Sequence, residues 1–242
     1  MQEDVYQGDG LNLYAYCGNN PVVYYDPSGY GLAEFLDVIE AFGDGKEGAT
    51  VEYWAQGFFS TYQERLGRTP IGQYRNNGEI IGLWEGARGE SLYRAFDYSD
   101  RATRANEVLQ QYGQRGITYN NAVPNFRPVS ETVVSIKNMT GQRYNTGGNF
   151  EQADEAFARF LNEHQDTEWL DKLGVDGEVT GQDIIDYRQS NKLTWHEEND
   201  RIHMDLVSED VNGTYGHLGG TSESKKQKNG QEYVQDTNCK SR

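Results

Sequence analysis

The chain has 242 residues, a formal net charge of −16 and a mean hydropathy of −0.85. No apolar run reaches the about 18 residues that a membrane-spanning helix needs, and the first residues have neither the basic nor the apolar region of a signal peptide. The two cysteines, Cys17 and Cys239, are too few for a disulfide scaffold and too far apart for a local metal-binding knuckle. We therefore expect a polar globular chain with a modest core and two plain thiols.

The acidic charge is concentrated in the first 190 residues. Residues 191–242 hold 7 Lys and Arg against 9 Asp and Glu, so residues 1–190 carry −14 of the net −16. Phosphate binding normally draws on Lys and Arg, so this acidic part is not expected to make broad contacts with nucleic acid. Its charge favours a basic partner or serves solubility.

The first 30 residues predict short β-strands separated by turns. Residues 11–16 alternate apolar and polar side chains, and residues 22–25 form a second short β-type run. Residues 18–21 and 26–29 carry the Gly, Asn and Pro that are typical of turns. So small a segment cannot fold alone, and we expect it to be the end of a larger repeat-built sheet.

The rest of the chain predicts an α+β fold in which helices alternate with short strands. Apolar residues recur at helical spacing, and Ser99 or Asp100 and Thr180 are the expected helix N-caps. The tail from Ser222 is polar and predicted to fray. We expect helices at 32–42, 53–66, 99–112, 150–161 and 180–188, short strands and turns within 68–98, and strands at 117–119 and 133–136.

Three of the four histidines fall in one short stretch, at His196, His203 and His217. The pattern there predicts a strand at 193–197, a second strand at 202–207 and a helix that starts near Ser208. Asn212 would lie on that helix and His217 just beyond it. His203 alternates away from Met204 and is predicted to face solvent.

This arrangement fits the hydrolysis of a phosphodiester bond, which needs a base to activate water and a cation to stabilise charge on the phosphate and the leaving oxygen. Taken alone, a histidine beside Trp195 is more often structural than catalytic. The dipeptide His196-Glu197 also begins a zinc-protease motif, but that motif requires a histidine at the position of Asp200. The ordered set of residues therefore favours a nuclease site.

The segment Asn12-Leu-Tyr-Ala-Tyr16 through Asp26-Pro27-Ser28-Gly29 resembles the conserved end of the core of Rhs/YD-repeat proteins. In that family the segment closes a β-shell, and a variable C-terminal toxin follows it. The resemblance implies that residues 1–30 end an Rhs core and that Asp26, Pro27 and Gly29 belong to the self-cleavage motif that frees the toxin. Tyr30 stands where an apolar residue is usual.

The later motif resembles the HNH/endonuclease VII superfamily, in its toxin branch with a Trp-His-His or Trp-His-Glu signature. The residues that carry the resemblance are Trp195-His196-Glu197, Met204-Asp-Leu-Val207, Asn212 and His217-Leu-Gly-Gly220. It implies a ββα-metal (His-Me finger) core at about 192–220, with catalytic His196 and Glu197 and with Glu197, Asn212 and His217 toward the metal. Glu197 stands where many members have a second histidine, so the assignment of base and ligand between His196 and Glu197 stays open.

The resemblance extends upstream and covers about residues 80–223, within a toxin domain at 31–223 and before a flexible tail at 224–242. The upstream blocks begin at Trp84, Tyr119, Asn138 and Asn149. Arg88 and Glu90, in the first block, are candidate substrate contacts, with a structural pair in a glycine-rich turn as the alternative.

The two resemblances together imply a secreted antibacterial effector that cleaves the DNA of a target cell with one divalent ion. A carboxylate ligand suits Mg²⁺ or Mn²⁺, and imidazoles suit Zn²⁺ or Ni²⁺. Expected partners are the DNA substrate, a cognate immunity protein and, before release, the Rhs shell. Export would use a specialised secretion system, and the toxin would act in the target-cell cytoplasm. The alternatives are a ribonuclease on the same scaffold and a non-catalytic binding module.

Overall fold

The computed structural model describes residues 58–72 and 78–230. These residues belong to Val51–Arg242, one of the two units into which the chain divides. The predicted strands at 11–16 and 22–25, the helix at 32–42, the Asp26-Pro27-Ser28-Gly29 motif and the end of the tail lie outside the described residues.

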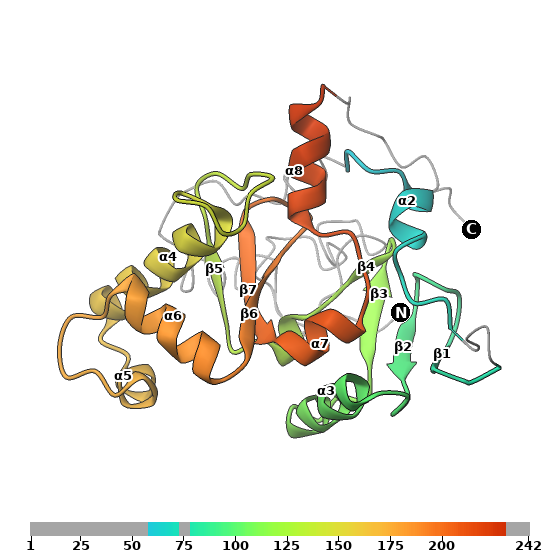
Figure 1. Ribbon diagram of the computed structural model, residues 1–242, viewed down its shortest axis with the longest axis horizontal. Coiled ribbons are helices and arrows are strands. Elements are labelled where there is room, and N and C mark those ends of the chain that lie inside the picture. Colours follow the sequence, from blue (N-terminus) through green and yellow to red (C-terminus); the bar gives the residue numbers. More distant parts are fainter. Residues whose placement is uncertain (1–57, 73–77, 231–242) are drawn as a thin grey trace, which may run out of the picture. The chain divides into compact units, whose positions relative to one another are not determined.

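Helices and strands alternate along the described chain, which has the α+β composition that the sequence predicted (Figure 1). The helices are α2 (Tyr62–Leu66), α3 (Asp100–Gln111), α4 (Asn149–His164), α5 (Thr167–Leu173), α6 (Gly181–Ser190), α7 (Glu209–Thr214) and α8 (Gly220–Lys228), with a 3-10 turn, η3, at Arg127–Val129. The strands are β1 (Gly82–Trp84), β2 (Leu92–Ala95), β3 (Ile117–Asn120), β4 (Val123–Pro124), β5 (Thr132–Ser135), β6 (Leu193–Glu197) and β7 (His203–Ser208).

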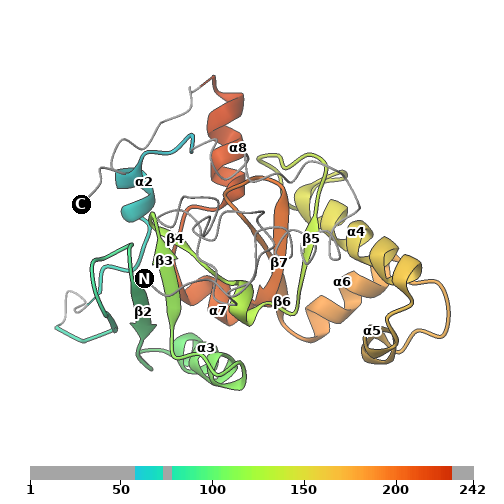
Figure 2. The ribbon, with the colours of Figure 1, turned by 180° about the vertical axis from the view of Figure 1, so that it is seen from behind.

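The strands form two antiparallel sheets, in the orders β1-β2-β3-β4 and β5-β7-β6. In the second sheet β7 is central, with His196 of β6 opposite Asp205 and Glu197 opposite Met204. Helices α4 and α6 pack on this sheet from one side and α7 packs on it from the other, as Figures 1 and 2 both show, and α3 packs against α7. The hairpin β6-β7 therefore lies between two cores.

The two cores receive alternate residues of the hairpin. Trp195, Met204 and Leu206 join a cluster built on α4 to α6, whereas Val207 joins Val211 and other residues in a cluster with α3 and the four-stranded sheet. Because side chains alternate along a strand and opposed residues share a face, the register fixes the side on which each polar residue lies. Glu197 shares the α4 face, and His196 and Asp205 share the α7 face.

Local signals account for the elements that the sequence placed well. Strand β6 has the predicted bounds, and Ser208 caps α7 by accepting a bond from the backbone N–H of Asp210. Ser99 caps α3, and Thr180 forms a capping box with Asp183 at the start of α6. The element order β6-β7-α7 is the order predicted for residues 193–214.

The prediction of a frayed tail from Ser222 is wrong for residues 222–228, which belong to α8. Glu223 is fully buried and accepts hydrogen bonds from the backbone N–H groups of Phe59 and Ser60, at 2.7 and 3.0 Å. Ser224 donates to the carbonyl of Met139 at 3.1 Å. These tertiary contacts hold a helix whose own composition is too polar to predict it.

None of the helices in the described part of the chain combines the length and the apolar character needed to cross a membrane.

Candidate functional site

Two histidines meet on the α7 face of the hairpin. The rings of His196, from β6, and His217, which follows α7, lie with centroids 4.6 Å apart and planes at 74°. Phe126 packs edge-on against both, with centroids 4.7 Å from His196 and 5.5 Å from His217. An apolar wall thus supports two imidazoles that are 21 positions apart in the sequence.

Both rings are neutral at pH 7. Burial lowers the pKa of His196 well below its usual value, and the neighbouring His217 lowers it further, while the carboxamide of Asn212 opposes the shift. Burial likewise lowers the pKa of His217 to about 4, against the effect of the carbonyl of Tyr215. A neutral imidazole offers a lone pair that accepts a proton or binds a metal ion.

The orientation of His217 follows from its contact with the backbone. Its Nδ1 lies 2.8 Å from the carbonyl oxygen of Tyr215. Because a carbonyl only accepts, Nδ1 carries the hydrogen, and the lone pair is on Nε2. This is the arrangement by which proteins fix a histidine for ligation.

The glycines after His217 are required by close packing. A Cβ on Gly220 would collide with the carbonyl oxygen of Glu198 and with Sδ of Met139, and one on Gly219 would lie 2.9 Å from the carbonyl oxygen of Glu197. The chain can therefore pass directly over the end of β6 only without side chains at these two positions. This pair of glycines brings His217 back to His196.

Glu197 is separated from the histidine pair by strand alternation. Its side chain is fully buried on the α4 face, where Arg143 donates through Nε at 2.5 Å and Asn149 through Nδ2 at 2.8 Å. Both carboxylate oxygens are thus occupied by protein donors. The structure does not bring Glu197 together with Asn212 and His217, although the sequence grouped the three as metal-side residues.

Arg143 is a site residue that the sequence analysis missed. Its side chain is 44% exposed, and Glu197 holds it through Nε. Its positive charge helps to lower the pKa values of both His196 and His217, which places the guanidinium near the pair. The only signal in the sequence was its position between the blocks at Asn138 and Asn149.

A second polar cluster adjoins the pair on the same face. Asp205 stands opposite His196 in the strand register. Glu198, Asp200 and His203, at the hairpin turn, each offer an atom that could bind a metal ion, and these atoms lie within 4.8 Å of one another. The sequence did not single out this group.

The prediction that His203 faces solvent is wrong. It does alternate away from Met204, but the face that it joins is covered by the second core, so the residue is only 3% exposed. Its Nδ1 makes a short hydrogen bond with Asp200, whose other oxygen accepts the backbone N–H groups of Ile202 and His203 at 2.9 and 3.0 Å. Burial lowers the pKa of His203, but the Asp200 carboxylate outweighs burial and raises it. Burial raises the pKa of Asp200, but His203 outweighs burial and lowers it to about 2.

Arg88 and Glu90 have structural contacts. Arg88 donates to the carbonyl oxygens of Leu66 and Thr69, at 2.7 and 2.9 Å, and so satisfies the end of α2. Glu90 accepts the backbone N–H of Asn121 at 3.0 Å. Both fasten loops of the four-stranded sheet, which agrees with the structural alternative, although no direct pairing between them is present among the described residues. Asp26, Pro27 and Gly29 lie outside those residues.

The residues of the histidine pair fit a metal ion. Oδ1 of Asn212 is buried close to the ring of His196, whose pKa the Asn212 side chain raises, but forms no hydrogen bond of normal geometry among the described residues. Together with the lone pair on Nε2 of His217 it makes an oxygen and nitrogen donor set, which suits a divalent cation. A buried carbonyl oxygen without a well-formed hydrogen bond is available to a ligand.

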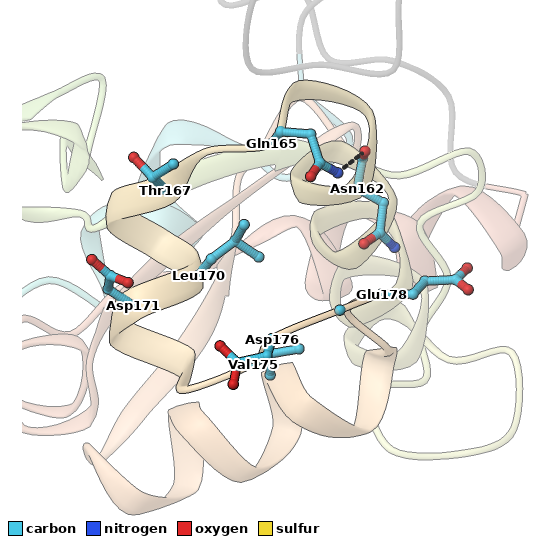
Figure 3. Close-up of a pocket in the computed structure, with 9 residues that line it drawn as sticks. Asn162, Gln165, Thr167, Leu170, Asp171, Val175, Asp176 and Glu178 are labelled. Atoms are coloured by element: carbon cyan, nitrogen blue, oxygen red, sulfur yellow. Dashed lines mark hydrogen bonds between the residues drawn. The ribbon is translucent and has the colours of Figure 1, made fainter.

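A separate pocket lies between the C-terminal end of α4, helix α5 and the segment that follows α5 (Figure 3). Asp171, Asp176 and Glu178 are among its lining residues, and the predicted site residues are not. All three carboxylates are exposed. The pocket is therefore distinct from the histidine pair.

One known protein family is similar to part of the chain. Residues 116–219 match the family model of the DNase/tRNase domain of colicin-like bacteriocins. Searches of curated proteins and of solved structures gave no match. The matched segment begins just before β3, ends two residues after His217 and contains the hairpin, α7 and Arg143. It supports a bacteriocin-like nuclease toxin domain in this part of the chain.

Proposed function

We propose that the protein is a metal-dependent endonuclease that hydrolyses phosphodiester bonds in the DNA of a target cell. The observation that carries the proposal is the convergence of His196, Asn212 and His217 from a strand, the following helix and the loop beyond it. Two neutral imidazoles and a buried carboxamide oxygen without a well-formed hydrogen bond lie on one side of the hairpin. The family match to a nuclease toxin domain covers all three.

His196 is assigned as the general base. A base must be unprotonated to take a proton from water, and its lowered pKa keeps His196 in that state across the neutral range. The same neutral ring would also suit a metal ligand. The two roles differ in one measurable respect, since loss of a base leaves metal binding intact and loss of a ligand does not.

Asn212 and His217 would hold one divalent ion, with Mg²⁺ or Mn²⁺ as the first expectation and Zn²⁺ or Ni²⁺ as the alternative that two imidazoles would favour. When bound, the ion would supply positive charge to the phosphate and to the leaving oxygen. The protein's own part is to present the two donors and to keep His196 unprotonated beside them.

Arg143 is assigned to the substrate phosphate. Glu197 fixes the guanidinium through Nε, and the side chain remains 44% exposed. A guanidinium held in this way offers its outer N–H groups to a phosphate oxygen in a planar fork. Glu197 then acts as an anchor for Arg143.

The biological setting follows from the resemblance of the first 30 residues to the end of an Rhs core. In this proposal the toxin is freed after the Asp26-Pro27-Ser28-Gly29 motif, exported by a specialised secretion system and active in the target-cell cytoplasm. An immunity protein would protect the producer. The match to a bacteriocin nuclease domain supports the toxin role.

A ribonuclease activity is the second candidate, because the matched family model covers both DNase and tRNase domains. Supercoiled plasmid and tRNA, offered side by side to the purified chain with Mg²⁺ or Mn²⁺, separate the two. Nicking of plasmid that EDTA abolishes supports the proposal, and cleavage of tRNA alone supports the ribonuclease. A folded chain that cleaves neither is a non-catalytic module.

A further inference from the structure

The turn of the β6-β7 hairpin buries three carboxyl groups in one cluster. Glu198, Asp200 and Asp205 are 9%, 8% and 1% exposed. Arg127 is the guanidinium that faces them, donating through Nε to Glu198 at 2.8 Å. Three buried carboxylates beside one guanidinium and the imidazole of His203 leave negative charge in excess even if all five groups are ionised, and burying unpaired charge is costly.

Polar atoms in this cluster also lack partners. Nε2 of His203, Oδ1 of Asp205 and Nη2 of Arg127 are buried without a hydrogen-bond partner among the described residues. His203 and Asp205 are at least 97% buried, so water does not satisfy them freely. Several unpaired atoms in one small region, on side chains that contact one another, indicate that the cluster is completed by something it binds.

The donor set defines the chemistry of that ligand. One atom each from Glu198, Asp200 and His203 lies within 4.8 Å of the other two, a separation that a single ion can bridge. Carboxylate oxygens favour hard divalent cations, and one imidazole among them suits Mn²⁺ as well as Mg²⁺.

We propose that Glu198, Asp200 and His203 form a second divalent-cation site, next to the histidine pair and distinct from it. Its ligands come from the turn, and Asp205 lies between this site and His196 in the strand register. The ion locks the hairpin turn by joining its two sides. This inference does not depend on the nuclease proposal, because the cation would bind and stabilise the fold whether or not the histidine pair is catalytic.

Mn²⁺ binding to the full 242-residue chain tests the site. Stoichiometry is measured by calorimetry and electron paramagnetic resonance, and stability by the Tm with and without Mn²⁺. In the double variant Asn212→Ala/His217→Ala, which removes the proposed nuclease ligands, one Mn²⁺ should still bind. At about a hundredfold excess over Kd the Tm should rise by roughly 5–10 °C.

The variant Glu198→Gln, combined with Asn212→Ala/His217→Ala, should lose that ion and the rise in Tm. The matched control Asp176→Asn/Glu178→Gln removes two carboxylates from the exposed pocket of Figure 3. It should leave the bound ion and the rise in Tm unchanged. Circular dichroism establishes that each variant is folded. Nitrogen coupling from a histidine in the spectrum of the Mn²⁺-bound chain that carries His196→Ala as well as Asn212→Ala/His217→Ala supports the site without any change to the cluster.

A folded Asn212→Ala/His217→Ala chain that binds no Mn²⁺ would overturn the proposal, as would unchanged binding after Glu198→Gln is added. Neither result touches the nuclease assignment, which is decided by plasmid cleavage. Conversely, an inactive chain that still binds Mn²⁺ at the turn would retain this inference and lose the proposed function.

Discussion

His196 and Glu197 are consecutive in β6, yet their side chains have different surroundings. His196 lies with His217 and Phe126, and Glu197 lies with Arg143 and Asn149. The sequence could name both residues but could not divide their roles, because Arg143 and Asn149 are 54 and 48 positions away from Glu197. Alternation assigns a side chain to a face, and only the tertiary structure shows what covers that face.

The same limit explains His203. Its direction along β7 was predictable from the period of two, but the second core that buries it comes from residues 93–129 as well as from α7. Asn212 and His217 were predictable because they follow the hairpin closely in sequence. Their partners are local: His217 contacts the carbonyl of Tyr215, two residues away, and Asn212 faces His196 within the ββα unit.

Glu197→Gln distinguishes an anchor from a base. Replacing the buried carboxylate weakens its ion pair with the half-exposed Arg143, and we expect a loss of about 1–3 kcal/mol in the free energy of unfolding. Cleavage by the folded variant should stay within about tenfold of wild type, since removal of a general base costs about 10²–10⁴-fold. Urea unfolding and plasmid nicking measure the two effects. Loss of all cleavage in a stable, folded Glu197→Gln protein would return Glu197 to the catalytic role.

The lowered pKa values of His196 and His217 predict how stability depends on pH. An unfolded histidine has a pKa of about 6.5. As pH falls from there toward the folded pKa of His217, about 4, the unfolded state binds protons that the folded state does not, so stability falls. The raised pKa of His203 acts in the opposite sense and adds stability below about 6.5. His217→Asn should therefore recover about 1–2 kcal/mol of the stability lost between pH 7 and 4.5.

Unfolding by urea at the two pH values measures this effect. His164→Asn is the matched control, because His164 is exposed at the end of α4. If the stability of His217→Asn falls with pH as steeply as that of wild type, the ring does not titrate in the way the structure indicates.

Among the elements, those with local signals were predictable from sequence. Strand β6 and the start of α7, α3 and α6 were placed by alternation and by capping residues. Helix α8 could not be, since its anchor is the contact of Glu223 with the backbone at residues 59–60, more than 160 positions away. Helix α8 starts at Gly220, which lies against the end of β6, so this element and the hairpin depend on each other.

Gly220→Ala tests that dependence. The added Cβ would collide with backbone at Glu198 and with Met139, so the hairpin turn must shift, and we expect a loss of about 1–3 kcal/mol. Gly213→Ala is the control: Gly213 is exposed within α7, where its nearest neighbour is the flexible side chain of Arg101, and alanine favours a helix. It should be neutral or slightly stabilising. Equal stability of the two variants in thermal unfolding would show that the turn tolerates a side chain at Gly220.

For the whole molecule, charge is the feature that the sequence gives directly. Residues 1–190 carry −14 of the net −16. Near the histidine pair, Arg143 and Arg127 supply positive charge, and each forms an ion pair with a glutamate. Substrate binding in the proposed nuclease therefore depends on few phosphate contacts, and the acidic charge favours a basic partner.

The association of an immunity protein with this acidic chain should depend on salt. Opposite charges speed the encounter, and screening removes that gain, so the on-rate should fall several-fold between about 50 and 300 mM salt. Stopped-flow or surface-based kinetics measure it. A salt-independent on-rate would assign the acidic charge to solubility.

The most direct test of the nuclease assignment is single-turnover cleavage of plasmid by the full chain and by His196→Ala, with Mn²⁺ binding measured on the same samples. We expect His196→Ala to be folded, to bind Mn²⁺ as wild type does and to cleave about 10²–10⁴-fold more slowly. His164→Ala, the control, should cleave at the wild-type rate. A folded His196→Ala protein that cleaves DNA as fast as wild type would contradict the account.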